Sequence, residues 1–177
     1  GVSRFALGRA ANNLVTNGEL DGTSGALTGM TGVAAVDSTF TGSGTCVASK
    51  QAISDQYDKQ VYTITGASAG DELLVEFDPL WAIGQRIFGG IDVDVTGDGV
   101  SGVNCYMSFT NAGNTRTETF NALSAVSNHA MGELYGIFKT PTIAVPSYYD
   151  SGRFYFKAIL SAGDSVIKIQ NAGVMAV

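Results

Sequence analysis

The sequence predicts an all-β fold, an antiparallel β-sandwich of jelly-roll type, and three observations carry this prediction. Apolar and polar residues alternate with a period of two over most of the chain, as in strands with one buried face. Clusters rich in glycine, asparagine and aspartate separate these segments, as turns do. Helix signals are nearly absent, with only a turn or two expected at residues 3–11. Short strands with one apolar face bury those faces against one another, which favours a sandwich, with a closed barrel as the alternative.

The strands are expected between four turn clusters, at residues 66–70, 96–99, 111–114 and 161–164. Residues 131–138 are ambiguous, and residues 22–32 and 140–150 are expected to be loops. The alternation predicts which side chains face the core. The predicted inward-facing residues are Leu73, Val75, Phe77, Ile91, Val93, Val95, Val103, Cys105, Met107, Phe109, Phe154, Phe156, Ala158 and Leu160.

Length and charge restrict the organisation and the function classes. A chain of 177 residues fits one domain, expected at residues 13–177 after a connector at 1–12. The net charge of −6 argues against binding to nucleic-acid phosphates, since ten scattered basic residues form no basic stripe. No apolar run reaches the roughly 20 residues of a membrane span, so no membrane insertion is expected.

The cysteines and the histidine limit the chemistry. Cys46 and Cys105 fit no zinc pattern. Cys105 lies in an alternating apolar series and is predicted to be a buried thiol, with a disulfide as the alternative. The single histidine, His129, excludes mechanisms that need two. No carboxylate spacing specifies a glycosidase pair, so the chain is predicted not to be an enzyme, although a longer protein containing it could degrade a polysaccharide.

One acidic segment has the spacing of a cation site. Asp92, Asp94 and Asp98 follow the D-x-D-x-T-G opening of an EF-hand-type calcium loop. The twelfth position of that loop is Val103 rather than a bidentate glutamate. The alternative is a hairpin whose solvent-facing positions are acidic.

A set of aromatic residues lies on polar faces or in loops. Aromatic rings stack on the apolar faces of sugars, and neighbouring polar groups such as Arg153 bind hydroxyls. The alternative for each ring alone is packing at the edge of the core. The candidate sugar-binding aromatics are Trp81, Tyr106, Tyr148, Tyr149 and Tyr155.

The segment Asn13–Asp21 (NLVTNGELD) resembles the opening of β-sandwich carbohydrate-binding modules of the galactose-binding-like fold. The segments 61–65 and 73–77 look like the middle hairpin of these modules, and 163–177 looks like their last two strands. The resemblance implies a structural calcium ion held by Asp21 and Asn171, with Glu19 as a further ligand. Asn171 departs from the usual aspartate.

The composition also resembles the distal domains of phage tail fibres and tailspikes, since charge is low and glycine is abundant. Together the two resemblances imply a non-catalytic domain that binds host polysaccharide on a virion tail or extracellularly, as a homotrimer. One alternative is a structural trimerisation or capping domain with no ligand. Another is a carbohydrate-binding module of a secreted polysaccharide-degrading enzyme. A small hydrolase or lyase is the third reading.

Overall fold

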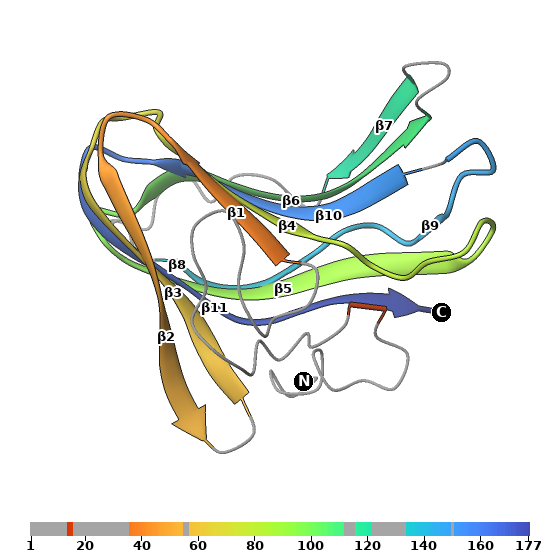
Figure 1. The fold of residues 1–177 in the computed structure, drawn as a ribbon, viewed down its shortest axis with the longest axis horizontal. Coiled ribbons are helices and arrows are strands. Elements are labelled where there is room, and N and C mark those ends of the chain that lie inside the picture. The colour runs from red at the N-terminus through yellow and green to blue at the C-terminus, as the bar shows by residue number, and fades with distance from the viewer. Residues whose placement is uncertain (1–13, 16–35, 55–56, 112–115, 122–133, 150) are drawn as a thin grey trace.

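The computed structural model describes residues 14–15, 36–54, 57–111, 116–121, 134–149 and 151–177, and it is a sandwich of two antiparallel sheets (Figure 1). The five-stranded sheet has the order β1 (Val36–Thr41), β4 (Glu72–Phe77), β10 (Ser151–Leu160), β6 (Val100–Asn111), β7 (Arg116–Asn121). The six-stranded sheet has the order β2 (Thr45–Ser54), β3 (Tyr57–Ala67), β11 (Gly163–Ala176), β5 (Arg86–Gly97), β8 (Leu134–Lys139), and β9 (Ile143–Ala144) also pairs with β5.

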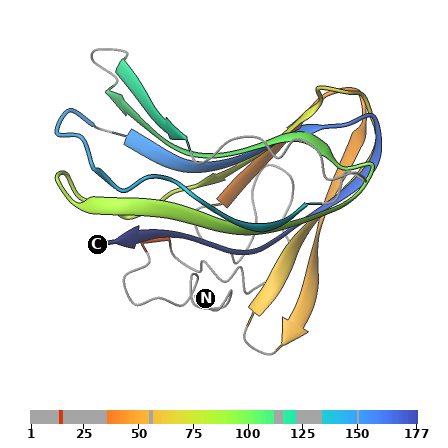
Figure 2. The same cartoon turned by 180° about the vertical axis from the view of Figure 1, so that it is seen from behind.

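The all-β, jelly-roll prediction is confirmed, because the chain crosses repeatedly between the two sheets. Successive strands change sheet from β1 to β2, from β3 to β4, from β4 to β5, from β5 to β6, from β7 to β8, from β9 to β10 and from β10 to β11. The β2–β3 hairpin stays within one sheet and projects away from the stacked layers in both views (Figures 1 and 2). Among the described residues, none forms a helix long and apolar enough to cross a membrane.

Two predicted hairpins are wrong. The segments 61–65 and 73–77 lie in β3 and β4, which belong to different sheets. The acidic segment at 92–99 likewise ends β5 and leads into β6 of the other sheet. A glycine-rich turn reverses the chain, but the sequence of the turn does not say whether the next strand pairs with the previous one or packs across from it.

The closing segment is one strand rather than the predicted two. β11 runs over 14 residues and has an irregular register between Ile169 and Asn171. Ile167 and Ile169 are buried before this point, and Ala172 and Val174 are buried after it. One extra residue at a bulge shifts the alternation while the strand continues. In the sequence, this change in the alternation of apolar residues looks like the end of one strand and the start of the next.

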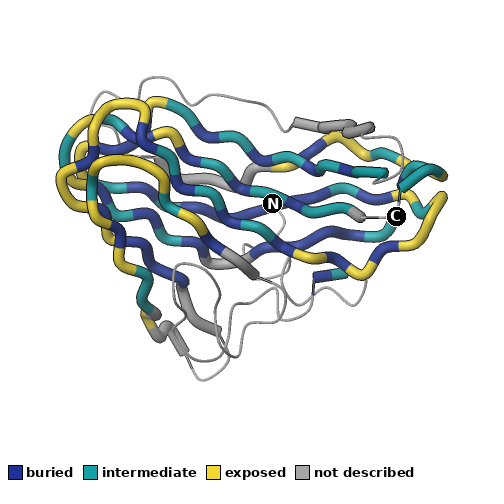
Figure 3. Tube along the Cα trace, turned by 45° about the horizontal axis from the view of Figure 1, so that its top comes forward, coloured by how far each residue is buried: buried dark blue, intermediate teal, exposed yellow. Residues whose placement is uncertain are grey.

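The core lies between the sheets, and buried positions alternate with less buried ones along the strands (Figure 3). Every inward-facing residue predicted from the alternation is buried, and Phe77 packs on Phe154 with ring centroids 5.7 Å apart. Each such aromatic or aliphatic side chain contributes about 1.5–3 kcal/mol of burial free energy. Cys105 is fully buried, as predicted, and neither it nor Cys46 forms a disulfide.

Residues 14–15 join the two sheets at one end of the sandwich. The amide of Leu14 donates to the carbonyl of Val174 at 2.7 Å, and the carbonyl of Leu14 accepts from the amide of Leu80 at 2.9 Å. Val15 is buried in the core. Leu80 follows β4, so this contact fixes the loop between β4 and β5 against the end of β11. The predicted connector at residues 1–12 lies outside the described residues.

Candidate functional site

The outer face of the five-stranded sheet carries a row of aromatic and charged residues. The strand register places Glu76 of β4 opposite Tyr155 of β10, and Tyr155 opposite Tyr106 of β6. The rings of Tyr106 and Tyr155 stack with centroids 4.7 Å apart and an interplanar angle of 16°. Side chains stand roughly perpendicular to a sheet, so the two rings stand side by side. Each ring therefore covers one face of the other.

A pocket of about 380 Å³ adjoins this pair, beside Tyr155. It forms where the loop after β4 meets the end of β6 and the start of β10. Its size is within the usual range of small-molecule sites. The lining residues are Asp78, Pro79, Trp81, Ser108, Thr110, Tyr149, Gly152, Arg153 and Tyr155.

Trp81 is a buried wall of the pocket rather than an exposed platform. Its side chain is 8% exposed. The indole packs on Phe109 at a centroid distance of 4.7 Å and meets Tyr149 edge-on at 6.2 Å. Tyr149 also meets Phe109 edge-on at 5.8 Å. The three rings therefore hold one another, and they fix the end of the pocket nearest the core.

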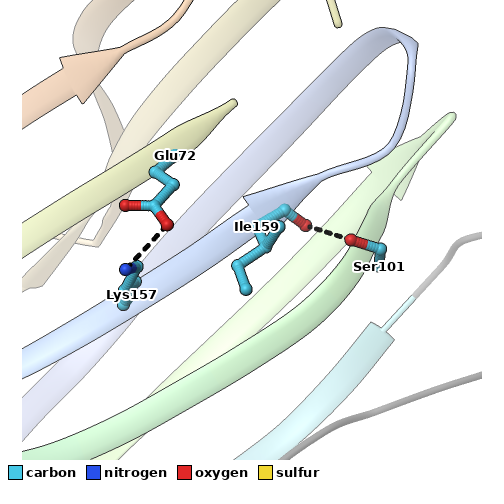
Figure 4. A network of polar contacts seen from close by, with 4 residues as sticks. All are labelled: Glu72, Ser101, Lys157 and Ile159. Carbon is cyan, nitrogen blue, oxygen red and sulfur yellow. Dashed lines mark hydrogen bonds and ion pairs between the residues drawn. The ribbon is translucent and has the colours of Figure 1, made fainter. Parts of the chain in front are cut away.

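Ion pairs flank the row of tyrosines on both sides. Arg153 pairs with Asp78 inside the pocket, and this hydrogen bond raises the pKa of Arg153. On the other side, Nζ of Lys157 lies 2.7 Å from Oε1 of Glu72, and the hydroxyl of Ser101 donates to the carbonyl of Ile159 at 3.3 Å (Figure 4). Both cations of this part of the face are thus bound to carboxylates from the same sheet.

Burial and negative charge both act on the stacked tyrosines. Burial raises the pKa of Tyr155 to about 12, and the charge of Glu76, which also accepts a hydrogen bond from Tyr155, adds to the effect. Burial raises the pKa of Tyr106 as well, and the charges of Glu76 and Glu72 contribute. Both phenols therefore stay protonated at neutral pH and can donate hydrogen bonds.

Most of the predicted sugar-binding residues meet in one place. Trp81, Tyr149, Arg153 and Tyr155 line the pocket, and Tyr106 stacks beside it. Tyr148 is not among the lining residues, and its carbonyl accepts a hydrogen bond from Nδ2 of Asn111 at 2.5 Å.

Sequence reasoning missed several pocket residues. Alternation in β6 places Ser108 and Thr110 on the same face as Tyr106, so this signal could have found them. Asp78 and Gly152 line the pocket only because β10 lies beside β4 in the observed register. No local pattern in the sequence indicates that register.

The D-x-D-x-T-G segment begins as strand rather than as a loop. Asp92 is buried, although it was expected to face solvent, and Asp98 lies in the exposed turn, where its carboxylate accepts the amide of Asp164 at 2.8 Å. Asp92 and Asp94 lie on the extended strand β5, where residues two apart are separated by about 6.6 Å, so the calcium site stays a prediction that this geometry does not favour.

Of the calcium ligands implied by the family resemblance, the structure describes Asn171 alone. Asn171 lies opposite Asp92 in the β11–β5 register, while Glu19 and Asp21 lie outside the described residues. Within the described part of the chain, no three histidine, cysteine, aspartate or glutamate side chains gather as metal ligands would.

Solved structures of carbohydrate-binding modules are similar to this chain in fold. One is from work on carbohydrate-binding modules of the β-sandwich superfamily, with a TM-score of 0.55 and 9% identity over 90% of this chain and 64% of that chain. Another, described as CBM4, has a TM-score of 0.51 and 10% identity over 92% of this chain and 99% of its own. The chain has the β-sandwich fold of these modules. The resemblance inferred from residues 13–21 is thus confirmed for the fold.

The enzymatically active domain of tailspike protein 4 from bacteriophage CBA120 is also similar. Its TM-score is 0.57, with 13% identity over 94% of this chain, and the chain spans only 22% of the length of that tailspike chain. No protein-family model matches the sequence, and no curated protein matches it. At sequence identities of 9–13%, these similarities show a shared fold alone.

Proposed function

We propose that this protein is a non-catalytic carbohydrate-recognition domain whose ligand lies on the outer face of the five-stranded sheet. The observation that carries the proposal is the pocket of about 380 Å³ beside the stacked pair Tyr106–Tyr155. Aromatic rings and several hydrogen-bonding groups converge there, which is the composition that saccharide recognition requires. The fold, shared with carbohydrate-binding modules, supports the same assignment as an analogy.

Each part of the pocket has a chemical role in this proposal. The hydroxyls of Ser108 and Thr110 and the phenol of Tyr155 exchange hydrogen bonds with sugar hydroxyls. The Arg153–Asp78 pair offers charged donors and acceptors already fixed in place, which bind more strongly than neutral ones. The exposed parts of Tyr149 and Tyr155 contact the apolar face of the ring.

The lining supports binding rather than hydrolysis. Glycosidases place two carboxyl groups across the scissile bond, about 5–10 Å apart. Among the lining residues the one carboxylate is Asp78, and it is held by Arg153. This lining therefore supports the proposal of a domain that binds its saccharide without cleaving it.

The test is a binding screen with matched variants. We expect saturable binding to a glycan array and weak single-site affinity by calorimetry. Tyr155→Ala should weaken binding about tenfold or more, since aromatic contacts and their hydrogen bonds dominate such sites. Thr63→Ala, on the opposite sheet, changes an exposed residue outside the pocket and should leave affinity unchanged. If no saccharide binds, or if both variants behave like the parent chain, the assignment is refuted.

The proposed setting is a virion tail or another extracellular location, where the domain binds host surface polysaccharide as a homotrimer. The tailspike similarity supports this setting. Trimerisation would raise avidity for a weakly bound repeating glycan. Light scattering should then give about three times the mass of 18.3 kDa. A monomer would favour instead a module of a secreted polysaccharide-degrading enzyme. A trimer that binds no glycan would favour a structural capping domain.

A further inference from the structure

The face that carries the pocket has more carboxylates than cations. Glu72, Glu76 and Asp78 are balanced by Arg153 and Lys157 alone, among the described side chains of β4, β6 and β10 and the residue after β4. Arg153 is already paired with Asp78 and Lys157 with Glu72. Glu76 is the third carboxylate, and it lies between the two pairs along β4.

Glu76 is placed directly at the aromatic row. It lies opposite Tyr155 in the register, on the side of that ring away from Tyr106, and Tyr155 hydrogen-bonds to it. Asp37 of β1 lies opposite Glu76 on the next strand. The row therefore places two carboxylate-bearing positions beside two aromatic rings, and no lysine or arginine lies in that row.

We infer that the saccharide bound on this face carries protonated amino groups, one of which lies against Glu76 and the ring face of Tyr155 that Tyr106 does not cover. This inference rests on the proposed function and names the ligand class of the same face, because Glu76 lies outside the pocket lining but directly beside Tyr155, which belongs to it. An ammonium group there donates a charge-assisted hydrogen bond to the carboxylate and is attracted to the aromatic face. An N-acetyl group keeps one N–H donor but carries no positive charge, so it gains neither the ion-pair attraction to the carboxylate nor the cation–π attraction to the ring.

The same arrangement disfavours anionic polysaccharides. Arg153 is the cation in the pocket lining, and its pairing with Asp78 already offsets its charge. Asp78 and the nearby Glu76 would repel a ligand carboxylate, and like charges brought together at an interface weaken binding strongly. Uronic-acid oligosaccharides should therefore bind least.

The test compares glycans that differ only in charge. The probes are glucosamine and galactosamine oligosaccharides, their fully N-acetylated forms, and a galacturonate oligosaccharide of equal length. Calorimetry is run at about pH 5.5, which lies between the ordinary pKa values of carboxylic acids and of amines, so that both groups are charged. The amino form should bind about tenfold more tightly than its acetylated partner in at least one sugar series, and the advantage should shrink as salt rises from about 0.02 M to 0.5 M.

Two variants isolate the carboxylate. Glu76→Gln should reduce the tenfold advantage of the amino form to about twofold or less while keeping binding of the acetylated form. Asp94→Asn removes the same charge from β5 in the other sheet and should keep the full advantage. Thermal melts of both variants check that each is folded.

The outcomes separate this inference from the proposed function. Equal binding of amino and acetylated forms, or tighter binding of the galacturonate, overturns the charge preference and leaves carbohydrate recognition intact. An amino preference that survives in Glu76→Gln also overturns the assignment to this residue. If none of the probes nor any glycan on the array binds, both proposals fail together.

Discussion

Gly152 is a pocket residue at which the addition of a single methyl group should disturb the packing of the pocket. A β-carbon added there would lie 2.6 Å from Cζ2 of Trp81, 3.0 Å from Cδ1 of Phe109 and 3.1 Å from the carbonyl oxygen of Ser108. Carbon atoms pack at about 3.5–4.0 Å, so the indole or the strand must move by about 1 Å. We expect Gly152→Ala to lower both the unfolding free energy and the affinity for saccharide.

The size of the effect follows from how tightly the indole is held. Trp81 is 8% exposed and packs on Phe109 and Tyr149, so it cannot swing freely away from an added methyl group. Overpacking of this kind costs about 1–3 kcal/mol. In a domain of this size each 1 kcal/mol lowers the melting temperature by about 2–4 °C, so the expected loss is about 2–12 °C.

The assay uses the chain's single tryptophan. Guanidinium unfolding followed by fluorescence reports on Trp81 itself. Gly102→Ala on β6 is the matched control, because its β-carbon would meet only Cδ1 of Ile159, at an ordinary 3.7 Å. The control should be neutral or slightly stabilising, since alanine restricts the unfolded chain. Repeating Gly152→Ala in a Trp81→Phe background, with unfolding of both backgrounds followed by circular dichroism because no tryptophan remains, should cost less, because the contact at Cζ2 is gone. An equal cost in both backgrounds, or a Gly152→Ala variant as stable as the control, would refute the steric argument.

Three further predictions follow from buried or hydrogen-bonded titratable groups. The Asp71 carboxylate accepts hydrogen bonds from the amides of Ser68, Gly44 and Ser43 at 3.0, 3.2 and 3.1 Å, and these bonds lower the pKa of Asp71. The ionised carboxylate therefore stabilises the folded state above the ordinary aspartate pKa, and this stabilisation is lost as the pH falls through the lowered value. Asp71→Asn should therefore lower the melting temperature at neutral pH, and a gap that did not narrow in acid would contradict this. Burial raises the pKa of Cys46 to about 11 and also raises the pKa of Cys105. A thiol reagent near pH 8 should therefore label neither cysteine until the chain unfolds, and rapid labelling of the folded chain would contradict their burial. Because Glu76 contributes to the raised pKa of Tyr155, Glu76→Gln should shift phenol ionisation to lower pH in an ultraviolet titration, whereas Asp94→Asn should not.

The buried face of each strand could be predicted from the sequence residue by residue. In β4, Leu73, Val75 and Phe77 alternate with the less buried Glu72, Leu74 and Glu76, and this follows from the geometry of a single strand. Which strands pair could not be predicted. Residues 61–65 and 73–77 are close in sequence yet lie in different sheets, because that choice depends on how both sheets bury their apolar faces together.

The candidate site was only partly predictable for the same reason. Alternation places Tyr106 and Tyr155 on outward faces of β6 and β10, but their stacking depends on the register between strands that are far apart in the chain. For Trp81, packing at the edge of the core was the alternative to sugar stacking, and its 8% exposure fits that alternative. The pocket needs segments 78–81, 108–110 and 149–155 at once, and no local pattern brings these together.

The position of Glu76 beside an aromatic ring is itself a consequence of core packing. If β10 slipped by two residues along β4, the same faces would stay buried, and Arg153 and Lys157 would lie opposite Glu76 and Glu72. The slip would also place Phe77 opposite Gly152 and separate it from Phe154. In the observed register Phe154 packs on Phe77, and both cations are already paired, Arg153 with Asp78 and Lys157 with Glu72. Core packing therefore favours this register, the ion pairs do not oppose it, and Glu76 faces Tyr155.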